Sequence, residues 1–365
     1  NAGDVRYNVL RWTSSPNPPF GGYGPSFSNP RTGQILSADI MLEDIYVSNR
    51  VRSDSIFTPD EPSSTLLNQR GLSAKHCLAS FNIARGNALG RISAAVLGNQ
   101  AATSRMVQES LYELTLHEVG HTLGLNHNMR GSQLVDNDKI HDASQTKGII
   151  SSSVMDYSAV NLAPPGQEQG DFYTTHPGPY DVWAIQFGYD PDLEGVSRTA
   201  HLARSAEPSL AFGNDADDMR SVGRAIDPKI NIGDMSSDAV GYASERFALL
   251  NETLKTLRTK MVRPDQSWAE LRNAYQVIAR EHQTQARVVS RYIGGVYIDR
   301  TLSTANTNTP VPYSPVPKAR QKEAMGVLHE SVFGVNAFKV SADLISHLGM
   351  QRRGFDHWGK TEDPK

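Results

Sequence analysis

A run of eleven residues from His117 to His127, His-Glu-Val-Gly-His-Thr-Leu-Gly-Leu-Asn-His, has the residue types and the spacing of a zinc site. On a helix, His117 and His121 lie one turn apart, about 6 Å along the axis, and leave the same face. Two imidazoles placed in this way can reach one tetrahedral ion. Gly124 has no Cβ, which allows the helix to end and the chain to turn back. We therefore expect His127 to be the third ligand and the fourth position to be open to water.

Glu118 is the residue of this run that is expected to handle a proton. It lies about 100° around the helix from His117, beside the expected ion but not bound to it. Zinc lowers the pKa of its bound water to about 7 and polarises a carbonyl group. Glu118 is then expected to take a proton from that water and to pass it to a leaving amine. The pattern predicts a zinc hydrolase, and two histidines packed in a helical core are the alternative.

A second pattern, Ser-Val-Met-Asp-Tyr, follows at residues 153–157. Together the two patterns resemble the metzincin zinc peptidases, which have a methionine in a tight turn after the zinc motif. The resemblance places Met155 beneath the three imidazoles as an apolar floor. It also matches Tyr157 to a tyrosine that in some metzincins approaches the zinc or the oxyanion. An ordinary core methionine and a packed aromatic ring are the alternatives for these two residues.

Further stretches are similar to a bacterial subgroup, the Met-zincin-type proteins. They are residues 7–12, 29–35, 180–185, 292–297 and 315–317, with Gln321. The resemblance covers most of the chain. It implies an exported zinc peptidase, either secreted, periplasmic or on the bacterial cell surface, with a helical region after the catalytic part. It implies no particular substrate.

The composition excludes several classes of protein. The chain has 365 residues, enough for two domains, and a net charge of −3, which leaves no electrostatic footprint for nucleic acid. It has no run of about 18 apolar residues, so no membrane span is expected. A single cysteine, Cys77, excludes an internal disulfide but not a periplasmic or surface location. We interpret Cys77 as a small buried hydrophobic residue.

The first half of the chain predicts the elements around the zinc motif. Residues 34–42 are apolar and bounded by turn formers and acids, which predicts a strand. Because metzincins bind substrate backbone at an edge strand, we interpret it as that edge, an interior strand being the alternative. Residues 14–30 are rich in Pro and Gly, which predicts a loop that does not take part in the hydrogen-bond ladder of a β-sheet. Apolar periodicity predicts a helix over 104–123, and weaker signals predict short helices near 66–82 and 88–96.

The second half predicts mainly helices. Residues 181–187 are expected to close the catalytic part, and a turn-rich acidic stretch suggests a boundary near residue 190. The later predicted elements are an amphipathic helix over 247–261, a helix from the capping box at 267–270 to 292, an extended segment at 309–317 and helices at 321–333 and 342–348.

Three other polar features have simpler interpretations. His141 lies in a polar loop and is expected to be solvated. His176 is interpreted as an ordinary loop histidine, with substrate contact as the alternative. The acidic residues at 214–218, with Asp227, Asp234 and Asp238, lack the spacing of a calcium loop and are interpreted as solvated turn carboxylates.

The start of the chain carries one further expectation. Metzincin catalytic domains normally begin with a strand and a long backing helix. Here only roughly 30 residues precede the strand at 34–42, and no amphipathic helix fits among them. We therefore expect Asn1 to lie inside the catalytic domain of a longer exported protein. The sheet is then incomplete, with exposed apolar surface and an N-terminal fragment as a partner.

The predicted fold is α+β. A metzincin-like catalytic domain, a mixed sheet with an active-site helix and a Met-turn, occupies residues 1–190, and an all-helical region occupies 191–365. The predicted function is a zinc-dependent endopeptidase acting on a peptide or protein, with Zn²⁺ as cofactor. A catalytically silent zinc-binding scaffold and a zinc amidase for a non-protein amide are the alternatives. The site residues are His117, His121 and His127 for the metal, Glu118 as the base and Tyr157 as an oxyanion donor.

Overall fold

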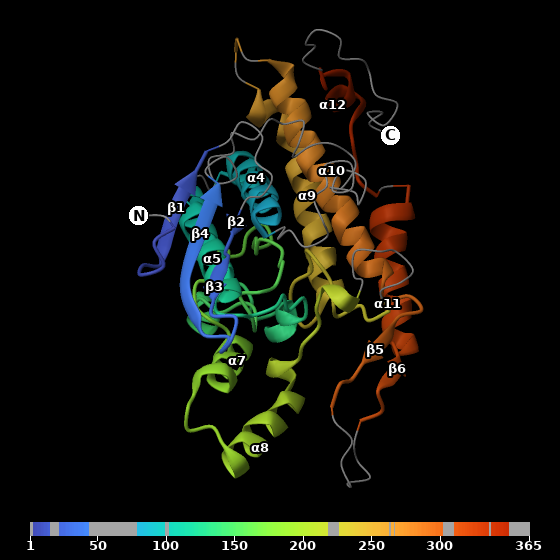
Figure 1. Ribbon diagram of the computed structural model, residues 1–365. Coiled ribbons are helices and arrows are strands. Elements are labelled where there is room, and N and C mark those ends of the chain that lie inside the picture. The colour runs from blue at the N-terminus through green and yellow to red at the C-terminus, as the bar shows by residue number, and fades with distance from the viewer. Residues whose placement is uncertain are drawn as a thin grey trace.

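The structure is a computed structural model that describes residues 3–14, 22–43, 79–98, 102–217, 226–262, 264–265, 267–301, 310–335 and 337–349. Cys77 and most of the helix predicted near 66–82 lie outside the described residues. The described part is α+β, as predicted. It contains a small mixed sheet, the helices that adjoin it and a long helical region (Figure 1).

The four-stranded sheet is built around β4 (Ile35–Glu43). β1 (Val9–Thr13) pairs with β4 in parallel. β2 (Gly22–Tyr23) and β3 (Ser26–Ser28) pair with β4 in the antiparallel direction and keep one register until a shift after Phe27. Among the described strands, β2 and β3 therefore act as two pieces of one edge strand.

Two sequence interpretations of this region are wrong. The strand predicted at 34–42 is confirmed, but it is not the edge strand, because β4 is paired on both sides. The loop predicted at 14–30 contains β2 and β3, so it does contribute to the ladder. Gly24 and Pro25 interrupt the strand without preventing the pairing on either side of them. Local composition could not show that the neighbouring β4 supplies the hydrogen-bonding partners.

Two long helices adjoin the sheet. α5 (Ala102–Thr122) packs against β4 and β2, and α4 (Ala79–Leu97) lies beside α5. α5 confirms the helix predicted at 104–123, and the helix predicted at 88–96 is part of α4. The helix that accompanies α5 thus follows the strands in the sequence instead of preceding them.

Short elements connect α5 to the second half of the chain. They are η1 (Gly131–Leu134), α6 (Ala143–Thr146), α7 (Pro179–Tyr189), α8 (Gly195–Ala203), η2 (Arg204–Ala206), η3 (Pro208–Leu210) and η4 (Asp215–Asp217). α7 confirms the helix predicted at 181–187. It begins at Pro179, a position where the missing backbone N–H removes no helical hydrogen bond. The sequence interpretation contained no equivalent of α8.

Most of the second half is helical, as predicted. α9 (Ala239–Met261) and α10 (Trp268–Ser290) pack along each other and confirm the two long helices. Ser267 caps α10 by accepting a hydrogen bond from the backbone N of Ala269 at 3.2 Å. The later elements are β5 (Val296–Ile298), β6 (Tyr313–Pro315), α11 (Lys318–Leu328), the π-helical turn η5 (His329–Phe333) and α12 (Ala342–Ser346). β6 lies in the predicted extended segment, whereas its partner β5 was not predicted.

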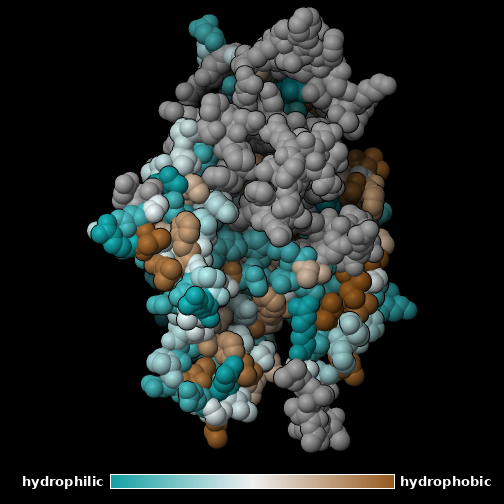
Figure 2. Space-filling view, in the orientation of Figure 1, coloured by the Kyte–Doolittle hydropathy of each residue, from teal (hydrophilic) through white to brown (hydrophobic). Residues whose placement is uncertain are grey.

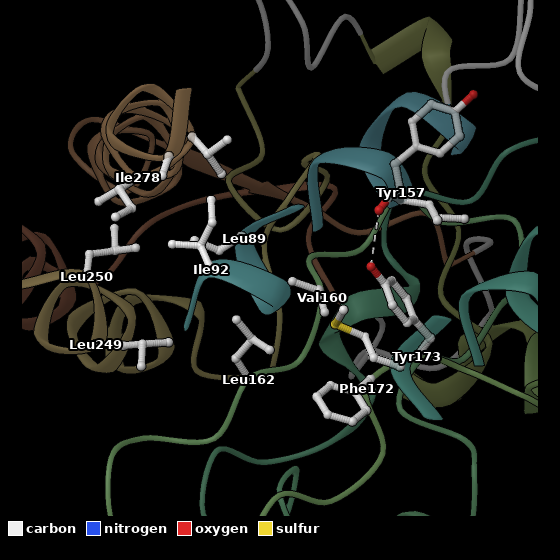
Figure 3. Packing of buried hydrophobic residues seen from close by; sticks show 14 of the residues in the cluster. Leu89, Ile92, Tyr157, Val160, Leu162, Phe172, Tyr173, Leu249, Leu250 and Ile278 are labelled. Atoms are coloured by element: carbon white, nitrogen blue, oxygen red, sulfur yellow. Dashed lines mark hydrogen bonds between the residues drawn. The ribbon is translucent and has the colours of Figure 1, made fainter. Parts of the chain in front are cut away.

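One hydrophobic cluster joins the two halves of the chain. It contains Leu89 of α4, Tyr157 from the segment after α5, Leu250 of α9 and Ile278 of α10 (Figure 3). The long C-terminal helices therefore complete the core that supports α4 and α5. The domain boundary near residue 190 stays a prediction.

Among the described strands, β1 lies at one edge of the sheet, and it carries exposed apolar side chains. Leu10 is 56% exposed and Trp12 is 55% exposed. Figure 2 shows hydrophobic side chains at the side of the molecule where β1 lies in Figure 1. The sequence predicts such a surface, and its cover by another fragment stays a prediction. In the part of the chain that the structure describes, no helix is both long and apolar enough to cross a bilayer.

Candidate metal centre

The end of α5 turns the chain back, as the glycine in the motif predicts. Gly124 has φ = +91°, in the left-handed region that favours glycine. The backbone N of Leu125 donates to the carbonyl of Gly120 at 2.9 Å, and that of Gly124 donates to the carbonyl of His121 at 3.0 Å. This turn satisfies the last carbonyl groups of the helix and returns the chain toward its own side chains.

The three predicted ligand histidines lie together as a result. One nitrogen atom from each of His117, His121 and His127 lies within 4.8 Å of the others. Among the residues described, they are the one group of three or more His, Cys, Asp or Glu side chains that could bind an ion. His117 is buried and the other two are half-buried, so a bound ion would keep access to solvent on one side.

Each of the three rings has an oxygen acceptor beside its Nδ1 atom. His117 Nδ1 lies 2.7 Å from the carbonyl oxygen of Val154, and His121 Nδ1 lies 3.2 Å from that of Leu125. His127 Nδ1 contacts a carboxylate oxygen of Asp215. A carbonyl or carboxylate oxygen can only accept, so these contacts favour the tautomer with the proton on Nδ1, which directs Nε2 of each ring toward the metal position. Three neutral imidazoles fixed in this way are a donor set that suits Zn²⁺.

Glu118 is fully buried beneath the edge strand. A Cβ atom at Gly22 would overlap Oε1 of Glu118, and one at Gly24 would overlap the carbonyl oxygen of Glu118. Only glycine allows the strand to approach the helix this closely. The contact brings the edge of the sheet next to the carboxylate that the sequence predicts as the base.

The turn that contains Met155 lies against α5 between two of the histidines. Met155 is fully buried, and a Cβ at Gly120 would overlap its sulfur atom. Asp181 of α7 fixes this turn: its two carboxylate oxygens accept from Ser153 Oγ at 2.6 Å and from the backbone N of Val154 at 2.9 Å. Burial raises the pKa of Asp181, and these donors oppose the rise. The sequence interpretation did not assign Asp181 a role.

Tyr157 lies beside the histidines with its hydroxyl directed away from the hydrophobic cluster (Figure 3). The hydroxyl oxygen is 3.0 Å from Nε2 of His127, and the ring stacks on that of His117 with centroids 5.6 Å apart. Tyr157 is therefore adjacent to the nitrogen that would bind a metal.

Two glutamates of α5, which precede His117 on the same helix, bind the backbone of residues 172–174. Glu109 accepts from the backbone N of Phe172 at 2.6 Å and from that of Tyr173 at 3.2 Å. Glu113 accepts from the backbone N of Thr174. Burial raises the pKa of both carboxyl groups, that of Glu113 to about 8. Nothing in the helical pattern distinguishes these residues from glutamates that face solvent.

Two histidines in the polar loops, His141 and His176, have different surroundings. His141 is buried, and its ring stacks on Tyr242 of α9, so the expectation that it is solvated is wrong. Its burial depends on a helix that lies far along the chain. His176 is exposed beside Thr175, and its contact with substrate remains only the alternative interpretation.

The acidic residues after 213 are not all solvated. Asp227 is buried and pairs with Arg130 at 3.0 Å, and Asp234 is buried and accepts from Ser132 Oγ at 3.0 Å. The interpretation as solvated turn carboxylates is therefore wrong for these two. Asp238 caps α9 by accepting from the backbone N of Gly241 at 2.9 Å.

Comparison with known families agrees with this geometry. The model of the family described as Met-zincin matches residues 99–363, from the start of α5 almost to the end of the chain. This chain belongs to the Met-zincin family. The match includes the three histidines, Glu118 and the long C-terminal helices, and it begins after the sheet. No curated protein and no solved structure matches the chain. The family and the histidine triad together support a zinc metallopeptidase.

Proposed function

We propose that this Met-zincin protein is a zinc-dependent endopeptidase in which Glu118 is the general base. The observation that supports this most directly is the orientation of the three imidazoles, each with Nδ1 beside an oxygen acceptor, which favours the tautomer that directs Nε2 toward the metal. Glu118 follows His117 on the same helix, with its carboxylate under the edge strand. The three histidines and the carboxylate of Glu118 therefore lie at the same end of α5.

Zinc bound there would act as a Lewis acid, polarising the scissile carbonyl and lowering the pKa of a water molecule. The residues of the chain perform the proton transfers. Glu118 accepts a proton from the attacking water and later delivers it to the leaving nitrogen. Its burial beneath Gly22 keeps the carboxylate in one orientation and reduces its contact with bulk water.

The hydroxyl of Tyr157 is proposed to donate a hydrogen bond to the oxyanion that forms from the carbonyl oxygen. Support comes from its distance of 3.0 Å from His127 Nε2, which places a donor beside the metal position. Met155, packed against Gly120, fits the proposed Met-turn beneath the imidazoles.

The substrate main chain is proposed to pair with the edge formed by β2 and β3. This edge replaces the strand at 34–42 that the sequence suggested. In the described residues β2 and β3 pair with β4 on one side, and Tyr23, Ser26 and Phe27 are exposed. An extended peptide added as a further strand would pass over Glu118. A main-chain binding mode that does not require a chain terminus favours endopeptidase activity.

We also propose that this activity lies outside the cytoplasm, which is what the resemblance noted in the sequence implies. The peptidase proposal is tested by digesting a peptide library with zinc-loaded protein and identifying the products by mass spectrometry. Cleavage within peptides, abolished by a chelator, supports an endopeptidase. Release of terminal residues alone, or of an amide from a non-protein substrate alone, would replace it with an exopeptidase or an amidase. Zinc binding without cleavage of either substrate type would favour a scaffold.

A further inference from the structure

The third histidine differs from the other two in the acceptor beside its Nδ1 atom. His117 and His121 face neutral backbone carbonyl groups, whereas His127 faces the carboxylate of Asp215. Asp215 lies 88 residues after His127 in the sequence, in η4. Asp215 therefore lies after the domain boundary that the sequence predicts near residue 190, outside the predicted catalytic part.

The segment that carries Asp215 is attached to the chain directly after His127. The backbone N of Met129 donates to the carbonyl of Gly213 at 2.7 Å, and the backbone N of Gly213 donates to Asn128 Oδ1 at 3.1 Å. The side chain of Asn128 also donates to the carbonyl of Ala211 at 3.1 Å. These bonds place the residues before Asp215 alongside the residues after the ligand.

A second attachment comes from further along the chain. Arg300 donates to the carbonyl of Phe212 at 2.9 Å and forms an ion pair with Asp217. Asp217 in turn accepts from the backbone N of Asn214 at 2.8 Å. The turn that presents Asp215 is therefore attached both to Asn128 and to Arg300, which keeps the backbone of Asp215 close to His127.

We propose that Asp215 is the positioning residue for the third zinc ligand, and that the helical half of the chain in this way contributes to zinc affinity. An N–H donated to a carboxylate fixes the tautomer and the ring orientation of a metal-binding histidine and increases its basicity. Three neutral imidazoles leave the charge of a divalent ion uncompensated, and Asp215 supplies a negative charge one ring away. The side chain of His127 is 11% exposed and that of Asp215 is 41% exposed, so the contact is shielded from water on the side of the imidazole.

This inference rests on the zinc site of the proposed function and not on peptidase activity. The test measures the zinc dissociation constant by competition with a chromogenic chelator for the wild type and for Asp215→Asn, Asp215→Glu and Asp192→Asn. Asparagine keeps the shape and removes the charge. Asp192 is an exposed aspartate for which the structure gives no contact with the three histidines, and it serves as the control.

Asp215→Asn is expected to weaken zinc binding by about 10- to 100-fold, the usual cost of losing such a partner. Asp215→Glu is expected to recover part of the affinity, and Asp192→Asn is expected to match the wild type. The visible absorption of the cobalt-loaded protein is expected to change in Asp215→Asn, because the His127 ring is no longer fixed. Circular dichroism of the zinc-free proteins shows whether the fold is intact. If it is not, Arg300→Ala tests the same attachment without altering Asp215 and is expected to weaken zinc binding several-fold.

Zinc affinity in Asp215→Asn within about twofold of the wild type, with an unchanged cobalt spectrum, overturns the inference and leaves the zinc site itself intact. If Arg300→Ala has to be used, wild-type affinity in that variant overturns it. A wild-type protein that binds no zinc overturns the zinc site and this inference together.

Discussion

Glu113 provides a quantitative test of the packing around the metal centre. It lies on α5 one turn before His117 and is 7% exposed. Burial raises the pKa of its carboxyl group to about 8, opposed by the hydrogen bond from the backbone N of Thr174 and assisted by the charge of Glu109. At neutral pH the folded protein therefore keeps Glu113 protonated, whereas the unfolded chain does not.

The sign of the effect on stability follows from this difference. Below the ordinary pKa of 4.5 both states bind the proton, and the folded state carries no penalty from Glu113. As the pH rises from 4.5 to about 8, the folded state retains a proton that the unfolded state has lost, so the free energy of unfolding decreases. A pKa displacement of this size corresponds to at most about 5 kcal/mol.

Glu113→Gln isolates this contribution, because glutamine mimics the protonated acid and still accepts from Thr174. Urea unfolding of the wild type and the variant, with saturating zinc, is measured between pH 4.5 and pH 9. The two proteins are expected to have similar stability at the acidic end, and the variant is expected to be more stable by about 3–5 kcal/mol at the alkaline end. Glu168→Gln, at an exposed position, is the control and is expected to follow the wild type. A difference between wild type and Glu113→Gln that varies by less than about 1 kcal/mol over this range would refute the assignment of a buried, protonated Glu113.

Three further predictions concern the site itself. His121→Ala is expected to lose the metal, because two neutral imidazoles rarely bind zinc tightly; metal analysis that finds one zinc per chain would contradict the ligand assignment. Tyr157→Phe is expected to lower kcat by about 10- to 100-fold with zinc retained, as for the loss of one oxyanion donor, and a steady-state assay with unchanged kcat would remove that role. Gly22→Ala is expected to displace the carboxylate of Glu118 and to lower kcat/KM while zinc content stays the same, because the added Cβ overlaps Oε1; wild-type kcat/KM would show that the strand can yield.

The zinc motif and its helix could be predicted from the sequence because their information is local. The spacing of His117 and His121 requires one helical turn, and Gly124 marks the helix end that the structure shows at φ = +91°. The long amphipathic helices α9 and α10 were predicted for the same reason, since each displays its own periodicity.

The features that the sequence did not reveal depend on distant partners. Residues 22–28 have the composition of a loop, and they form an edge strand because β4 is available to pair with them. Asp215 looks like one more acid in a turn until the chain after His127 lies beside it. Glu113 is buried beside the backbone of Thr174, and His141 is buried beside Tyr242 of α9. Both partners lie far along the chain, as does Phe172, which is 63 residues from its partner Glu109. The local pattern around Glu113 and His141 therefore could not predict their burial.

The central claim is that the metal site hydrolyses peptide bonds with Glu118 as the base, and Glu118→Ala tests it most directly. The measurement combines kcat/KM on a peptide that the zinc-loaded wild type cleaves with the zinc content of both proteins. The account predicts one zinc per chain in each protein and a kcat/KM that falls by about 100- to 10,000-fold in the variant, the range attributed to general acid–base catalysis. A variant that retains its zinc and cleaves the peptide nearly as fast as the wild type would contradict the account.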